Sequence, residues 1–273
     1  MKKTGTREWA EKTINLFTGN CANGCIYCYA SANNNRFGKP GDKVLKKDIL
    51  RHNYQKREYL TMYPSTHDIR LEDIELHVEF LQNFLRSGSP MLIVSKPSLL
   101  VVERLCKELK PFRDQVEFRF TIGSSNSAAL SFFEPEAPRY SERYASVIRA
   151  STLGYRVSLS IEPMLDQHPE RVIEDMKEFI TGDIWVGKLN QPQARLKLNG
   201  HEDKLAKVMR LVEWQSNNEN IMEIVWRLSK YPNVRWKDSI QEVINASPCL
   251  WVKDGCIHSN TELCNPKCKG YGL

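Results

Sequence analysis

Short apolar runs alternate with stretches of helical periodicity over the first 190 residues, and this alternation constrains the fold more than any other feature. The predicted strands cover residues 13–17, 59–63, 91–94, 116–121, 156–161 and 184–189. The predicted helices cover residues 69–85, 97–110, 141–153 and 169–180. Such alternation is typical of βαβ units, in which parallel strands carry helices on their outer side. Six strands are too few to close an eight-stranded barrel, so we predict an α/β fold with a partial (β/α)6 barrel.

The pattern changes after about residue 190. Residues 191–199 are predicted to form a loop and residues 201–230 to be helical, while 231–273 show little periodicity and many turn-forming residues. We therefore predict a core domain over 1–195, followed by a C-terminal helical segment and a cysteine-rich tail over 196–273.

Composition places the chain among globular proteins, because 41% of its 273 residues are hydrophobic and 26% are charged. No apolar run approaches the roughly 18 residues that a membrane-spanning helix needs, and no apolar signal segment follows Met1. The expected location is therefore the cytoplasm, with no membrane partner. In a reducing compartment, eight cysteines favour metal or redox chemistry over disulfides. The net charge of +6 is compatible with a nucleic-acid partner.

Three of these cysteines form a C-x3-C-x2-C motif directly after the first predicted strand, at Cys21, Cys25 and Cys28. Three thiolates on one loop can bind three irons of a cubane cluster and leave the fourth iron open to another ligand. A structural zinc site requires four ligands, and no fourth Cys or His follows until His52. The spacing therefore favours a [4Fe–4S] cluster.

The motif resembles the signature of the radical S-adenosylmethionine (SAM) superfamily, in which an aromatic residue, here Tyr27, precedes the last cysteine. The resemblance implies that the open iron binds the amino and carboxylate groups of SAM. It also implies that one-electron reduction yields methionine and a 5′-deoxyadenosyl radical, which abstracts hydrogen from a substrate. The electron would come from a donor such as flavodoxin or ferredoxin, and Tyr27 would lie near the adenine.

A longer likeness, over about residues 12–190, is to the spore photoproduct lyase-like branch of that superfamily. It is carried by residues 15–19, 28–30, 93–96, 120–124, 134–138 and 143. Spore photoproduct lyases also carry a cysteine shortly after the cluster motif, which returns a hydrogen atom to the repaired base. No cysteine occurs here between Cys28 and Cys106, and Cys106 falls on the apolar face of a predicted helix. The likeness therefore supports the scaffold and the radical chemistry, but not lesion repair by that route.

Residues at the carboxyl ends of the predicted strands are the candidates for binding SAM. Ser65, Thr66 and Asp68 suit its ammonium group, although Thr66 or Asp68 can equally cap the next helix. Thr121, Ser124 and Ser125 suit the ribose hydroxyls or ordinary turn bonds. Further candidates are Glu162 and Arg143; Arg143 can pair either with a SAM carboxylate or with Glu134. Of the histidines, only His67 follows a strand near the predicted site.

Four more cysteines lie in the tail, at Cys249, Cys256, Cys264 and Cys268. Four thiolates in a short, turn-rich segment indicate a bound metal centre. We predict an auxiliary iron–sulfur cluster, with a structural zinc or free thiols as the alternatives.

These observations predict a radical SAM enzyme whose substrate is a nucleic-acid base. One alternative is a peptide- or protein-modifying radical SAM enzyme with an auxiliary cluster. The other is a non-enzymatic zinc or iron–sulfur module that binds nucleic acid.

Overall fold

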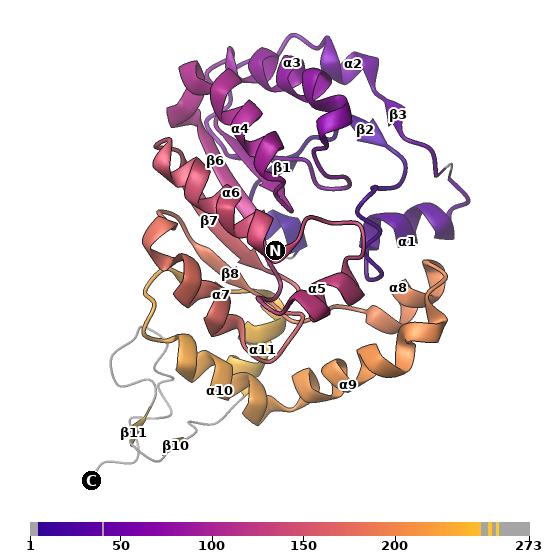
Figure 1. Cartoon of the computed structure of the whole chain (residues 1–273), viewed down its shortest axis with the longest axis vertical. Coiled ribbons are helices and arrows are strands. Elements are labelled where there is room, and N and C mark those ends of the chain that lie inside the picture. Colours follow the sequence, from indigo (N-terminus) through magenta and orange to yellow (C-terminus); the bar gives the residue numbers. More distant parts are fainter. Residues whose placement is uncertain (1–4, 40, 247–250, 253–254, 257–273) are drawn as a thin grey trace.

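The computed structural model describes residues 5–39, 41–246, 251–252 and 255–256, the last two pairs as backbone only. A sheet of seven parallel strands forms its centre, in the order β1-β4-β5-β6-β7-β8-β9. The sheet curls into an open partial barrel (Figure 1). Its strands are β1 (Lys12–Thr13), β4 (Thr61–Tyr63), β5 (Met91–Ser95), β6 (Val116–Thr121), β7 (Arg156–Ile161), β8 (Ile184–Val186) and β9 (Val234–Trp236).

Helices cover the convex side of the sheet, and further helices follow in the C-terminal part of the chain (Figure 1). They are α1 (Tyr29–Arg36), α2 (Lys47–Leu50), α3 (Ile74–Leu85), α4 (Leu99–Glu108), α5 (Ser127–Phe133), α6 (Tyr140–Thr152), α7 (Pro169–Met176), α8 (Pro192–Leu198), α9 (Leu205–Ser216), α10 (Asn218–Leu228) and α11 (Asp238–Ala246). A short antiparallel pair, β2 (Phe17–Thr18) with β3 (Val44–Leu45), lies outside the main sheet. Between β2 and α1 runs the loop that carries the first three cysteines.

Successive residues of each strand point to opposite faces of the sheet, so the strands contribute side chains both to the helix side and to the concave side. On the helix side, residues such as Phe118, Phe120 and Leu159 are fully buried in the main hydrophobic core. On the concave side, Met62, Leu92 and Val94 pack against Ala10 of the N-terminal segment, with Trp9 beside them. This double burial explains why β5 is an almost continuous apolar run.

The structure confirms the predicted α/β partial barrel and adds to it. The seventh strand, β9, lies in a region for which we expected little regular structure, and it pairs with β8. Residues 192–198, expected to be a loop, form helix α8, which begins with Pro192 at a position that suits proline. The first predicted strand, 13–17, is divided into β1 and β2, which join different sheets.

Among the described residues, no helix has both the length and the apolar character needed to cross a bilayer.

The stacked rings of Phe118 and Phe120 provide a test of this core. Replacing Phe118 with Ala should lower the free energy of unfolding by about 3–5 kcal/mol, because it leaves a cavity among fully buried side chains. Replacing Leu100, whose surface is 58% exposed, with Ala should change it by less than about 0.5 kcal/mol. Urea titration measures both values, and equal effects would contradict the assigned core.

Candidate functional site

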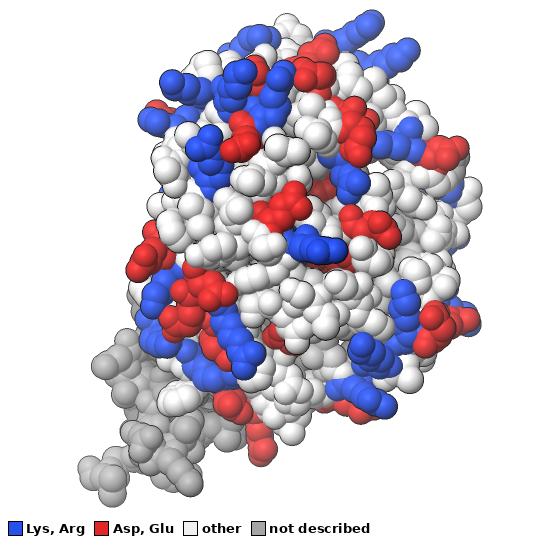
Figure 2. All heavy atoms as spheres, viewed as in Figure 1, with Lys and Arg blue, Asp and Glu red and all other residues white. Residues whose placement is uncertain are grey.

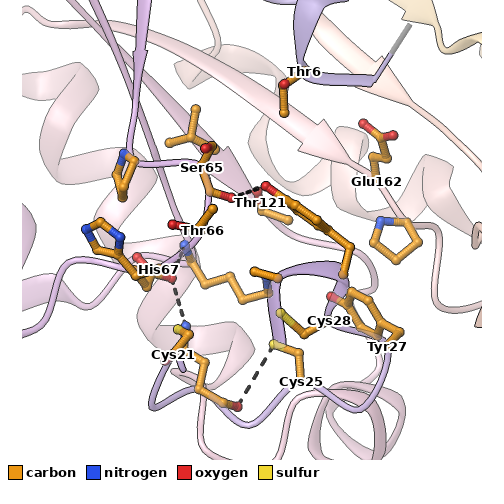
Figure 3. A pocket seen from close by; sticks show the side chains of 18 of the residues that line it. Thr6, Cys21, Cys25, Tyr27, Cys28, Ser65, Thr66, His67, Thr121 and Glu162 are labelled. Carbon is orange, nitrogen blue, oxygen red and sulfur yellow. Dashed lines mark hydrogen bonds between the residues drawn. The ribbon is translucent and has the colours of Figure 1, made fainter. Parts of the chain in front are cut away.

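A cavity of about 390 Å³ opens at the carboxyl ends of the strands. This is the edge at which parallel α/β sheets place their active sites. Figure 3 shows the three cysteines, Tyr27, Ser65, Thr66, His67, Thr121 and Glu162 around it. Its other lining residues are Gly5, Thr6, Trp9, Asn23, Tyr29, Ala30, Met62, Pro64, Asp68, Val94, Ser95, Lys96, Pro163, Lys188, Asn190 and Arg195.

The cysteine loop brings Cys21, Cys25 and Cys28 to this one cavity as free thiols. The Cys28 sulfur accepts a bond of 3.5 Å from the backbone N–H of Ser31 and so caps helix α1. Gly24 adopts a positive φ of +58°, which lets the chain turn sharply between the first two cysteines.

This donor set fits an iron–sulfur cluster better than a single ion. The described residues contain no group of three His, Cys, Asp or Glu side chains gathered around one ion position. A cubane needs no such convergence, because each thiolate binds a different iron. Burial raises the pKa of the Cys21 and Cys25 thiols, so the thiolate form is favoured by positive charge nearby, which the iron of a bound cluster would supply.

The buried carboxylate of Glu134 lies against the cysteine loop and anchors it. It pairs with Arg143 at 2.5 Å, lies 3.7 Å from the Lys96 ammonium, and accepts a hydrogen bond from the Tyr27 hydroxyl. Burial alone would raise the pKa of Glu134, but Lys96 and Arg143 hold it below its ordinary value. Of the two partners expected for Arg143, the structure therefore contains Glu134, and Arg143 does not line the cavity.

The segment after β4 is preorganised. Asn15 accepts hydrogen bonds from the backbone N–H groups of Ser65 and Thr66, at 2.7 and 3.1 Å. Asp68 accepts from the Asn23 amide at 2.8 Å, and also from the Ser95 hydroxyl and the Lys96 backbone N–H. Ser65, Thr66 and Asp68 all line the cavity, and Asp68 ties the cysteine loop to strand β5.

Of the three candidate residues at the end of β6, only one reaches the cavity. Thr121 lines the cavity, whereas Ser124 and Ser125 do not. The Ser124 hydroxyl donates to Asp166 and accepts from the backbone N–H of Asn126, so it performs the turn role that was one of its two expected roles.

Glu162 reaches the cavity from the end of β7 and belongs to a buried charge cluster. Lys237, only 1% exposed, pairs with Glu8 and lies 3.5 Å from Glu162. Burial raises the pKa of Glu162 to about 7, although the positive charge of Lys237 acts to lower it. The side chain therefore changes its charge near neutral pH.

His67 lines the cavity beside the fully buried His77, with ring centroids 5.8 Å apart. Burial lowers the pKa of both imidazoles to about 3, so both rings are neutral at pH 7. Neither ring nitrogen of His67 has a hydrogen-bond partner among the described residues.

Sequence reasoning missed a second anchor of the cysteine loop, Asn199. Its amide donates to the backbone carbonyls of Ile26 and Cys28, at 3.1 and 3.0 Å. It also missed Lys96 and Arg195 as lining residues. Cys106, as expected, is buried in the core; burial raises its pKa to about 12.

The predicted tail centre at Cys249, Cys256, Cys264 and Cys268 lies outside the residues whose side chains the structure describes. It stays a prediction from the sequence.

Comparisons with known proteins agree with the fold. No family model matches the chain. An uncharacterized protein, ORF301, of Acidianus two-tailed virus is 28% identical over 187 residues, which cover 62% of this chain and 60% of the relative. The chain thus spans less than two thirds of that protein.

Two kinds of solved structure share the architecture. A variant of spore photoproduct lyase, with bound AdoMet (SAM) and dinucleoside spore photoproduct, matches at a TM-score of 0.53 and 19% identity, over 74% of this chain and 64% of the lyase. SuiB of Streptococcus suis, bound to S-adenosylmethionine, matches at 0.51 and 10% identity, over 90% of this chain and 56% of SuiB. The predicted likeness to the lyase branch is confirmed at the level of the fold.

The Asn199 anchor is testable. Asn199→Ala should reduce the iron retained after anaerobic reconstitution and lower the free energy of unfolding by about 1–3 kcal/mol, because two loop carbonyls lose their donor. Asn220→Ala is the matched control, since its amide donates to the Trp214 carbonyl. If both variants retain iron equally, Asn199 does not hold the loop in its cluster-binding form.

The buried ion pair between Arg143 and Glu134 gives a second test. Arg143→Leu should cost about 3–5 kcal/mol of unfolding free energy, because it leaves the buried Glu134 carboxylate short of a partner. Adding Glu134→Leu should recover part of that loss. A double variant as unstable as the sum of the two single variants would show that the pair is not coupled.

Proposed function

We propose that this protein is a radical SAM enzyme. The observation that carries the proposal is the position of Cys21, Cys25 and Cys28, which share one cavity at the carboxyl ends of a partial barrel. Solved proteins of the same fold bind SAM. A [4Fe–4S] cluster held by these three cysteines would supply the electron that cleaves SAM to methionine and a 5′-deoxyadenosyl radical.

The chain's own residues have separable tasks in this proposal. Ser65, Thr66 and Asp68 border the cavity beside the cysteine loop, where polar oxygens accept bonds from the SAM ammonium. Tyr27 lies against the cavity wall, with its hydroxyl fixed by Glu134, and offers a ring face to the adenine. Thr121 and Glu162, on the neighbouring strands, are within the same cavity and suit the ribose hydroxyls.

The proposed substrate is a nucleic-acid base. Support comes from the fold shared with a lyase that binds both SAM and a dinucleoside photoproduct, and from the net charge of +6. Among the residues whose side chains the structure describes, the only cysteine outside the loop is Cys106, which is buried in the core and does not line the cavity. The proposed reaction therefore does not use a cysteine of this region to return hydrogen. A flavodoxin- or ferredoxin-type protein is the proposed electron donor.

The cysteine loop is the point to test. Cys28→Ala should abolish release of 5′-deoxyadenosine from SAM under dithionite, because the cluster loses one of three ligands. Cys106→Ala is the matched control and should retain the activity, since Cys106 lies away from the cavity. Chromatography of anaerobic reactions measures the product. Wild-type protein that is reconstituted with iron and sulfide, yet releases no 5′-deoxyadenosine, would contradict the proposal.

A further inference from the structure

Three polar side chains of the cavity lining come from the connection between β8 and α8 and from α8 itself: Lys188, Asn190 and Arg195. We refer to these three residues as the β8–α8 rim. None of them belongs to the cysteine loop or to the strand-end residues discussed above for SAM. Their chemistry differs too, because two of the three are cations.

The backbone of this connection is held in place from both sides. The Ser239 hydroxyl accepts a hydrogen bond from the Lys188 N–H at 3.1 Å, and the Gln215 side chain accepts one from the Leu189 N–H at 2.9 Å. At the far end of α8, Asn199 is bonded to the cysteine loop. The rim therefore has a fixed position relative to the cysteines before any ligand arrives.

Neither cation forms a direct ion pair with a carboxylate of the described residues, although Glu242 interacts electrostatically with Lys188, and Glu162 with Arg195. Within residues 5–39 and 41–246, no ion pair or side-chain hydrogen bond involves Lys188 or Arg195. The two carboxylates that line the cavity are already engaged, Asp68 by three donors and Glu162 by Lys237. The guanidinium of Arg195 lies 6.0 Å from the centre of the Tyr29 ring, near the cysteine loop.

Partial burial makes an anion a favourable neighbour for these two cations. Burial lowers the pKa of both Lys188 and Arg195, while Glu242 and Glu162 respectively act in the opposite direction. An arginine fork and a lysine next to an amide together match the oxygens of a phosphate group.

The size of the cavity places the anion on the substrate. About 390 Å³ is near the lower end of the roughly 300–1,000 Å³ typical of small-molecule sites, so bound SAM takes up most of the interior. A second reactant must then bind next to SAM, at lining residues that the SAM assignment does not use, and the rim is such a group. On the outer face in Figure 2, Lys and Arg alternate with Asp and Glu without forming a continuous basic track. On the described residues, the rim is therefore a better phosphate site than that face.

We infer that the β8–α8 rim binds a phosphate group of a nucleotide substrate and so presents the attached nucleoside to the cavity. This inference rests on the proposed function and names the substrate class more closely. The phosphate can belong to a nucleic-acid strand or to a free nucleotide, and the experiment separates the two.

The test uses the full chain with its cluster reconstituted and SAM bound but not reduced. A fluorescent single-stranded trinucleotide and thymidine monophosphate serve as probes, and Arg195→Gln and Lys188→Gln as variants. Each variant should weaken probe binding about tenfold or more, because one charge-assisted contact to phosphate is lost. Each should also reduce the slope of log affinity against log salt concentration by about one.

Lys197→Gln is the matched control, because Lys197 is an exposed residue of the same helix that does not line the cavity. It should change probe affinity by less than about twofold. A trinucleotide with uncharged methylphosphonate linkages should bind wild type and rim variants alike. Effects on the trinucleotide alone would assign the phosphate to a strand, and equal effects on the monophosphate would assign it to a free nucleotide.

Several outcomes would overturn the inference. For wild-type protein, these are binding to neither probe, or tighter binding to an acidic peptide than to the probes. For the rim variants, they are a probe affinity equal to that of Lys197→Gln, or a loss of SAM affinity as large as the loss of probe affinity. The last outcome would assign the cations to the SAM carboxylate. Release of 5′-deoxyadenosine by wild-type protein is measured in parallel, so failure of the rim with intact SAM cleavage leaves the proposed function standing.

Discussion

The buried Glu134 carboxylate is the interaction on which the site depends. A fully buried carboxylate is unfavourable unless cations and donors surround it, and here Arg143, Lys96 and the Tyr27 hydroxyl do so. The same segment also binds the cysteine loop through its backbone, where the Ile26 N–H donates to the Phe133 carbonyl at 3.0 Å. These contacts, together with the burial of Ile26 and Tyr27 in a small hydrophobic cluster, hold the loop at the end of the sheet.

The cysteine loop is held from its other side by α8. Asn199 bonds to two of its carbonyls, and the Asn35 amide donates to the Leu198 carbonyl at 2.9 Å. Because α8 also carries Arg195, the contacts that position the cysteines also position the rim. A change at Asn199, which joins α8 to the loop, is therefore expected to affect metal binding and substrate recognition together.

Local pattern was sufficient for much of the fold. Strands β6 and β7 have the predicted bounds, because each alternates apolar with polar residues and ends at a turn. The cysteine loop was identified by spacing alone. Arg143 shows the limit of such reasoning, since its sequence neighbourhood allowed two partners and only the packing places Glu134 against it.

What the sequence did not reveal depends on contacts between distant residues. Asn199 reaches carbonyls 171 and 173 positions away, and no local pattern marks an asparagine at the end of a helix as an anchor for another loop. Strand β9 has only three residues and is recognised by its pairing with β8 rather than by its composition. Lys237 looks like a surface lysine in sequence but is buried between two glutamates.

The most direct measurement of the central claim is electron–nuclear double resonance on the reduced, reconstituted protein. SAM would carry magnetic isotopes in its amino and carboxylate groups. Three cysteine ligands leave one iron open, so we predict coupling of both groups to the cluster spin. A cluster whose spectrum is unchanged by labelled SAM would contradict the assignment of Cys21, Cys25 and Cys28 as the SAM-binding cluster site.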